Sequence, residues 1–232
     1  MNKYVRDAIT FPRDTRAAWR HQGASGVWRE MRVRTLDRIT EWGHAVLLEH
    51  ALADNPGVPL PEGVRIAAFA GPDWTRFLEL ASPARIAGFR QRIARGRECL
   101  VAWRGERPIG FIWISTSMDR DMETYPLPLP PDVTYHWDLH VASSERGNGI
   151  GTALAFEPLH RPCEKTFRAG WRLIDFDNFA SQRGAKKIAG PSTRVIGEVR
   201  YVRIFRWSRC RYMPGEESPR SAKLRAALGH PR

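Results

Sequence analysis

The sequence predicts an α/β fold in which a sheet carries helices on both faces, with a helical extension at the N-terminus. Three observations support this prediction. From residue 64 onward, short β-prone runs alternate with stretches of helical periodicity, in the order β-αα-ββ-β-α-β-α-ββ. Residues 1–57 instead show helical periodicity alone. With 232 residues, of which 42% are hydrophobic, the chain is long and apolar enough to fill the core of such a domain.

The N-terminal extension, residues 1–57, is expected to contain a short helix and a longer one. Ser25 is a suitable N-cap for the longer helix. An apolar stripe with helical spacing follows it, formed by Trp28, Met31, Leu36, Ile39, Trp42, Val46 and Leu47. We expect this stripe to pack on its own domain; a position on a membrane surface is the alternative.

Residues 58–213 are expected to form the main domain. Strands are predicted at residues 64–70, 99–103, 109–117, 133–141, 171–177 and 193–212, the last range holding one or two arginine-rich strands. Helices are predicted at residues 74–80, at 83–95, from about 149, and at 178–189. The third helix should kink or end near Glu157, because Pro158 and Pro162 fall inside it. Residues 214–232 are expected to be a flexible basic tail.

Composition argues against several classes of protein. The longest run without a charged residue has eleven residues, Pro108–Met118, whereas a membrane-spanning helix needs about 20 apolar residues. We therefore expect no transmembrane segment. We also expect no secretory signal, because the N-terminal residues mix charges and lack an apolar run. The three cysteines, Cys99, Cys163 and Cys210, are too few and too far apart for a disulfide scaffold or a zinc site, which favours reduced thiols in a cytoplasmic protein.

The positive charge is concentrated in the last third of the chain. Lysine and arginine exceed aspartate and glutamate by 37 to 25, a net charge of +12. Residues 161–232 hold 17 basic and 6 acidic residues, so they carry +11 of that charge. Such a region attracts phosphates, nucleic acid, anionic lipid or an acidic carrier protein.

A glycine-rich turn follows the strand predicted at residues 133–141. Gly147, Gly149 and Gly151 allow unusual backbone dihedrals and leave successive N–H groups uncovered at the start of a helix. The positive end of the helix dipole lies at the same place, which makes the turn suitable for a pyrophosphate. A Walker loop is excluded, because no Gly-Lys-Ser/Thr follows. A dinucleotide-binding fold fits less well, because its spacing is Gly-x-Gly-x-x-Gly, although Asp175 keeps this alternative open.

Three motifs resemble those of one known family. The run Val141-Ala-Ser-Ser-Glu-Arg-Gly-Asn-Gly-Ile-Gly151 resembles the Arg/Gln-x-x-Gly-x-Gly/Ala signature of the GCN5-related N-acetyltransferase (GNAT) superfamily, with the valine placed as that family's fourth strand requires. Residues 95–103 and 108–113 look like its second and third strands, and residues 178–183 are similar to the start of its last helix. The resemblance covers about residues 62–212.

The resemblance implies a mixed, mostly antiparallel sheet whose fourth and fifth strands splay apart to hold the pantetheine arm of acetyl-CoA or another acyl-CoA. It implies that the pyrophosphate lies on the glycine turn and that an amine attacks the thioester directly, with no metal. The residues that it assigns to the cosubstrate are Val141, Arg146, Gly147, Asn148, Gly149, Ile150, Gly151, Thr152 and Asn178.

Candidate proton-transfer groups lie on the strand that precedes the turn. Strand alternation places His136, Asp138 and His140 on one face and Trp137 and Leu139 on the other. A polar face in a central strand is costly to bury unless it lines a wet cleft, so Asp138 or His136 is a candidate base or relay. A hydrogen-bonded structural trio is the alternative. A metal site on these side chains would need further ligands.

The group that protonates the leaving thiolate departs from the family's pattern. Many members of the family carry a tyrosine seven residues after the asparagine that matches Asn178, and here that position is Ala185. The resemblance therefore leaves the protonation of the thiolate to Ser181, to a water or to another tyrosine. A thiolate can also leave unassisted, because the pKa of its thiol is only about 8.5.

The amine acceptor is expected to be a small molecule, a peptide or a lipid precursor, and the acidic, proline-rich loop Met118–Asp132 would favour a cationic one. Nine tryptophans and the N-terminal helices suggest, as an alternative, a long-chain N-acyltransferase that uses acyl carrier protein and has a deep apolar groove around Trp113 and Trp137. A third possibility is a non-enzymatic module that binds nucleic acid or a membrane surface, because arginines alternate with aromatic residues in residues 195–212. A charged edge strand would show the same pattern.

Overall fold

The computed structural model describes residues 40–52, 58–69, 71, 74–119, 127–159, 167–188, 193–204, 207–215 and 218–227. Its elements in chain order are β1 (Thr40–Ala51), β2 (Val64–Ala68), the 3-10 helix η1 (Trp74–Glu79), α3 (Pro83–Ala94), β3 (Glu98–Arg104), β4 (Arg107–Ser115), β5 (Val133–Val141), η2 (Ser143–Glu145), α4 (Ile150–Phe156), η3 (Glu157–Leu159), β6 (Ala169–Asp175), α5 (Phe179–Ile188), β7 (Thr193–Ile204), β8 (Trp207–Pro214) and α6 (Pro219–Ala227).

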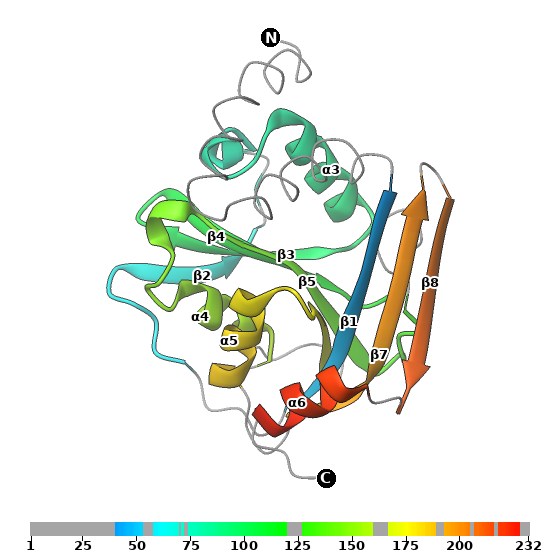
Figure 1. Ribbon diagram of the computed structural model, residues 1–232. Coiled ribbons are helices and arrows are strands. Elements are labelled where there is room, and N and C mark those ends of the chain that lie inside the picture. The colour runs from blue at the N-terminus through cyan, green and yellow to red at the C-terminus, as the bar shows by residue number, and fades with distance from the viewer. Residues whose placement is uncertain are drawn as a thin grey trace, which may run out of the picture. The chain divides into compact units, whose positions relative to one another are not determined.

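The strands form one sheet in the order β2-β3-β4-β5-β6-β1-β7-β8. β3 pairs antiparallel with β2 and β4, β4 with β5, and β1 with β6, whereas β5 and β6 are parallel. Figure 1 shows α3 on one face of the strands β3 to β5, and α4 with α5 on the other. This confirms the predicted mixed, mostly antiparallel sheet with helices on both faces. The parallel pair needs a crossover connection, which α4 supplies.

The prediction of an N-terminal helix is wrong for residues 40–51, which form β1. This strand lies between β6 and β7, and residues 45–51 pair with residues 169–175 of β6. Ala45, Val46, Leu47 and Leu48 are each at most 1% exposed. A strand covered on both faces has such a continuous apolar run, and the run also satisfies helical spacing. Residues 1–39 of the expected extension lie outside the described residues.

The chain comprises two compact units. Residues 44–199 and 212–232 form the larger one; residues 1–43 and 200–211 form the smaller one, of which the structure describes only strand ends. Within the smaller unit, Gly43 lies against Tyr201, and a Cβ on Gly43 would come within 2.1 Å of the tyrosine hydroxyl oxygen. The domain boundaries expected after residues 57 and 213 stay predictions.

Alternate residues of β3 and β4 form two cores, one on each face. On one face Val101, Phe111 and Trp113 pack with Phe89 of α3 and Phe77 of η1. On the other face, a second cluster joins the sheet to α4 and includes Leu100, Ala102, Ile112, Ile150 and Leu154. α4 ends at Phe156 and continues as η3, as the two prolines predict.

A β-bulge interrupts β5. Phe111 of β4 pairs with His140 and Trp113 pairs with Trp137, so Asp138 and Leu139 together oppose one residue. Asp138 adopts φ 49°, the left-handed region that non-glycine residues rarely occupy. The bulge breaks the strand alternation that the sequence predicts, so the arrangement of His136, Asp138 and His140 on one face is wrong.

Contacts with α3 show which way the bulge turns. The Oδ1 atom of Asp138 accepts from Nη2 of Arg85 at 2.6 Å, and Oδ2 accepts from Nη1 of Arg92 at 2.5 Å. The Arg92 guanidinium also lies 4.2 Å from the ring centre of Trp137, a cation–π distance. Trp137 and Asp138 therefore both face α3. His136 lies on the opposite face, beside Gly170 and η3.

A buried carboxylate holds α6 against the sheet. Glu198 of β7 is fully buried and accepts hydrogen bonds from the Ser218 backbone N–H at 2.7 Å and from the Ser221 hydroxyl at 2.5 Å; His44 also contacts it. Burial alone would raise the pKa of Glu198, but these hydrogen bonds lower it to about 2. The flexible tail expected after residue 213 is therefore wrong for residues 219–227, which form α6 with Ser221 and Leu224 buried.

We predict that Asp138→Ala destabilises the fold more than Asp138→Asn. Both variants lose charged hydrogen bonds to α3, but alanine is also strained at a positive φ that asparagine tolerates. The expected fall in the free energy of unfolding is about 2–4 kcal/mol for alanine and about 1–3 kcal/mol for asparagine, measured by urea denaturation. Asp119→Ala, which removes the exposed pair with Arg95, should cost less than about 1 kcal/mol. Equal losses for the two Asp138 variants would contradict the strain argument.

We predict that Glu198 gives the fold an acid-sensitive component of stability. Its pKa is lowered in the folded protein, so its contribution is complete above the unfolded value near 4.5 and is lost as pH falls towards 2. Glu198→Gln should lower the melting temperature at pH 7, and the difference from the wild type should shrink between about pH 4.5 and pH 2. The matched control is Glu62→Gln, which makes the same substitution at an exposed position. A difference that stays constant with pH would refute this.

Candidate functional site

The site begins where β5 and β6 separate. The two strands pair only from Val133 to Tyr135 on β5 and from Ala169 to Trp171 on β6. Beyond this point β5 continues to Val141 and β6 to Asp175, but no further pairs join them. β6 instead pairs with β1 as far as Asp175. The result is a wedge between the two strands, as the splayed central strands of the prediction require.

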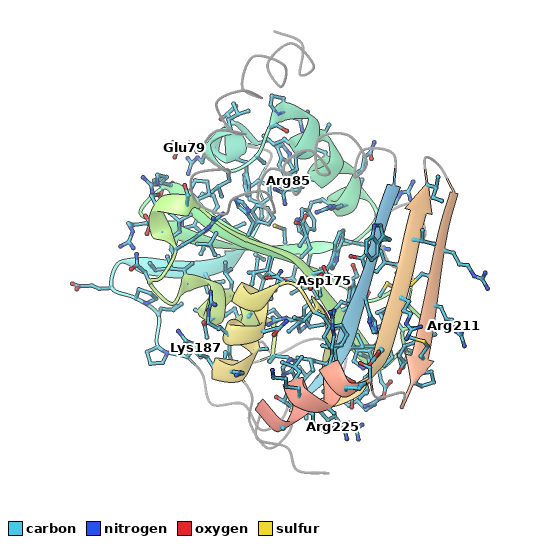
Figure 2. The ribbon with its side chains drawn as sticks, in the orientation of Figure 1. Glu79, Arg85, Asp175, Lys187, Arg211 and Arg225 are labelled. Atoms are coloured by element: carbon cyan, nitrogen blue, oxygen red, sulfur yellow. The ribbon has the colours of Figure 1, made fainter. Side chains whose placement is uncertain are left out.

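A cavity of about 670 Å³ occupies this wedge. It is lined by β5, by the glycine turn, by α4 and α5, and by residues 172 and 173 of β6. Figure 2 shows Lys187 of α5, one of the lining residues, on the opposite side of the sheet from Arg85 of α3. Most of the lining therefore lies on the α4–α5 side, but the cavity also reaches Trp137 and Asp138, whose side chains contact α3.

Most of the predicted site residues meet in this one cavity. The lining includes His136, Asp138, Val141, Arg146, Gly147, Gly149, Gly151, Thr152, Asn178 and Ser181. Two predicted cosubstrate residues are not among those that line it. Asn148 is exposed on the turn, and the Ile150 side chain is buried in the core on the α4 face. Only the backbone of Ile150 is therefore available to a ligand.

The glycine turn is uncovered. Gly147 and Gly149 have φ of 87° and 79°, a left-handed conformation that glycine adopts without strain. A Cβ on either residue would meet nothing within 4 Å. The hydrogen bonds within α4 begin with the N–H of Ala153, which donates to the carbonyl of Gly149. The N–H groups of residues 150–152 therefore have no partner within the helix.

Basic side chains surround the turn, and the acidic residue nearest to it in sequence is neutralised. Arg146, Arg183 and Lys187 line the cavity. The buried carboxylate of Glu145 accepts from Arg104 at 3.0 Å and from Arg107 at 2.9 Å. This part of the cavity therefore has a positive charge that suits phosphate groups.

Asn178 and Ser181 lie together at the start of α5. The Oδ1 atom of Asn178 accepts from the backbone N–H of Ser181 at 3.0 Å, so Asn178 is the N-cap of the helix. Ala185, which replaces the family's tyrosine, is fully buried in a core cluster with Val46 and Leu48. Within the described residues no tyrosine lines the cavity.

The two candidate bases are constrained in different ways. His136 is buried, and its Nε2 lies 2.9 Å from the Thr134 hydroxyl oxygen. Burial, and then the positive charge of Arg172, lowers the pKa of His136 well below its usual value, so the ring is neutral at pH 7. Each carboxylate oxygen of Asp138 already accepts a charged hydrogen bond, one from Arg85 and one from Arg92.

The sequence analysis missed three of the cationic residues at the site. Arg172, Arg183 and Lys187 line the cavity, but only the fold brings them to it. Arg172 had one local signal, because it interrupts an otherwise apolar stretch of β6. The described residues contain no group of three histidine, cysteine, aspartate or glutamate side chains that would hold a metal ion. No described helix is long and apolar enough to cross a membrane.

Comparisons with solved structures find similar proteins at low identity. A GCN5-related N-acetyltransferase from Sphaerobacter thermophilus shares 12% identity with a TM-score of 0.50, over 86% of this chain and 60% of that chain. A GCN5-related N-acetyltransferase from Kribbella flavida shares 12% identity with a TM-score of 0.38, over 64% of this chain and 54% of that chain. This chain thus spans little more than half the length of either protein. Among curated proteins no match is found.

A model of the acetyltransferase (GNAT) family matches residues 66–183, just over half of the chain. The matched range holds the two splayed strands, the glycine turn and the first part of α5, so it includes most of the residues that line the cavity. The motif resemblance, the sheet and the family match agree: the chain belongs to the acetyltransferase (GNAT) family.

Proposed function

We propose that the protein is an N-acyltransferase that moves an acetyl or longer acyl group from acyl-CoA to an amine by direct attack in a ternary complex. The observation that carries this proposal is the uncovered glycine turn at the open end of the wedge between β5 and β6. Family membership supports acyl transfer in general. The acyl-CoA donor and the amine acceptor are part of the proposal.

We propose one direction for the donor in the cavity. Its diphosphate would accept hydrogen bonds from the N–H groups of residues 146–152, with the Thr152 hydroxyl as a further donor and Arg146, Arg183 and Lys187 around it. From there the pantetheine arm would run along β5 beside Val141. Past Tyr135 this side of β5 has no strand partner, so its backbone groups can pair with the amides of the arm.

The thioester would then lie near the bulge of β5. A bulge leaves one residue without a ladder partner, and the freed backbone N–H at Asp138 or Leu139 is our candidate donor to the thioester oxygen. The amine attacks the carbonyl carbon, its proton leaves, and the carbon–sulfur bond breaks to release the thiolate. In this proposal the backbone of β5 positions the thioester, and no step requires a metal.

Proton transfer is assigned as a relay. Asp138 is held by two arginines and His136 is a weak base, so we propose that water passes the amine proton to one of them. Ser181 lines the same cavity and is the candidate acid for the thiolate, which can also leave unassisted. These three residues are the proposed catalytic groups.

The acceptor is proposed to be the amine of a small molecule, a peptide or a lipid precursor, and the protein is proposed to be cytoplasmic. The long-chain alternative required an apolar groove around Trp113 and Trp137. Trp137 lines the cavity, whereas Trp113 is fully buried in the α3 core and does not line it. The comparisons give no support to an acyl carrier protein or a nucleic acid as partner.

We predict that Gly151→Glu abolishes CoA binding. A Cβ at Gly151 would lie 3.5 Å from Val141, which is an ordinary contact, so the variant should fold. Its carboxylate would lie at the glycine turn, where the diphosphate is proposed to bind. Isothermal titration with CoA should show at least about a tenfold loss of affinity, equal to about 1.4 kcal/mol. In a thermal-shift assay, the stabilisation that CoA gives the wild type should disappear.

The matched control for this experiment is Gly88→Glu. It adds the same charge to α3, on the other side of the sheet, where a Cβ meets nothing within 4 Å. We expect it to bind CoA like the wild type. Binding that is unchanged in Gly151→Glu, or absent from the wild type with every acyl-CoA tried, would refute the proposed donor site.

A further inference from the structure

Arg172 lies at one end of the cavity, where β5 and β6 still pair; this end is called the closed end of the cleft below. Arg172 follows Trp171, the last residue of β6 that pairs with β5, just as His136 follows Tyr135 on the other strand. Both Arg172 and His136 line the cavity. At about 3.3 Å per residue, this end lies about 16 Å along β5 from Val141, away from the glycine turn.

The guanidinium of Arg172 has no counter-charge from the described residues. Its Nη2 donates to the Ala155 carbonyl at 3.2 Å, which uses one of its five N–H groups. No described carboxylate forms an ion pair with it. Glu49, on the neighbouring strand β1, bonds to Trp171 at 2.9 Å and to Arg194 at 2.8 Å.

The acidic residues of the cavity are also occupied. Asp138 is paired with Arg85 and Arg92, and Glu145 with two arginines of the β3–β4 hairpin. Neither is free to balance the charge of Arg172. The closed end of the cleft therefore has a positive charge that no described side chain offsets.

Arg172 is half-buried, which makes this uncompensated charge costly. Burial lowers the pKa of Arg172 to about 10, which still leaves the side chain cationic at pH 7. The two histidines near it do not add charge, because burial lowers the pKa of His50 to about 3 and that of His136 well below its usual value. A cation removed from water is stabilised by an anion that hydrogen-bonds to it.

We infer that Arg172 binds a carboxylate of a substrate at the closed end of the cleft. The inference rests on the proposed function, because the donor's direction places the acyl group and the attacking amine at this end. The donor's phosphates lie at the other end, where Arg146, Arg183 and Lys187 surround the turn. The planar guanidinium matches a carboxylate with two parallel hydrogen bonds.

Two substrates can bring this carboxylate, and both have the same chemistry. The donor can carry a dicarboxylic acyl group, in which case the acyl chain ends on Arg172. The acceptor can instead be an amine that also bears a carboxylate, such as an amino acid. In either case Arg172 is a residue that determines specificity and acts by binding, outside the bond-making step.

The donor arm of the experiment compares succinyl-CoA with butyryl-CoA, which has the same chain length without the charge. The acceptor arm compares amino acids with their carboxamides, added to protein saturated with CoA. We measure dissociation constants for the wild type, Arg172→Gln and Arg172→Lys. In at least one of the two arms, the wild type should bind the compound with the carboxylate about ten- to a hundredfold more tightly than the compound without it. Arg172→Gln should lose this preference, and Arg172→Lys should keep part of it.

Arg183→Gln is the matched control, because it removes the same charge from the phosphate end of the cavity. It should weaken both CoA thioesters equally and leave their ratio unchanged. A wild type that binds butyryl-CoA but shows no carboxylate preference in either arm overturns the inference and leaves the proposed function standing. A wild type that binds no CoA compound overturns the proposed function itself. If Arg172→Gln does not fold, Arg172→Lys tests the residue, and a carboxylate preference unchanged from the wild type overturns the inference.

Discussion

The site depends on the separation of β5 from β6 after three paired residues. Each strand keeps a partner on its other side: β6 runs beside β1 as far as Asp175, and β5 runs beside β4 to Val141. Neither strand can close the gap without breaking that ladder. α4 connects the two strands and packs on the sheet through Ile150 and Leu154, which places the glycine turn at the open end of the gap.

Helix α3 fixes the backbone of β5 that borders the cavity. Arg85 and Arg92 are seven residues apart, two turns of α3, so they reach the bulge of β5 from the same face of the helix. Their bonds to Asp138 hold a backbone conformation that this residue would otherwise avoid. The stability of the α3–β5 contact and the geometry of the cleft thus rest on the same ion pairs.

The glycine turn could be predicted because its conformations have local causes. Gly147 and Gly149 adopt positive φ, and the residues that follow begin a helix. The central strand β1 could not be predicted, because the apolar run at residues 45–48 satisfies the pattern of a helix as well as that of a buried strand. The bulge has no sequence signal, since the φ of Asp138 is stabilised by arginines 46 and 53 residues away. Whether Arg172 has a counter-charge is likewise decided by tertiary contacts alone.

In the proposed reaction, the end of the cavity where β5 and β6 still pair would favour deprotonation of the acceptor amine without a strong base. Burial there disfavours positive charge: it lowers the pKa of His136 and of Arg172. In the proposed reaction, an ammonium group that enters the same environment experiences the same desolvation. The acceptor amine would therefore lose its proton more readily than in water. A paired Asp138 and a neutral His136 are then sufficient as relays, because the cavity itself supplies part of the driving force that a stronger base would otherwise provide.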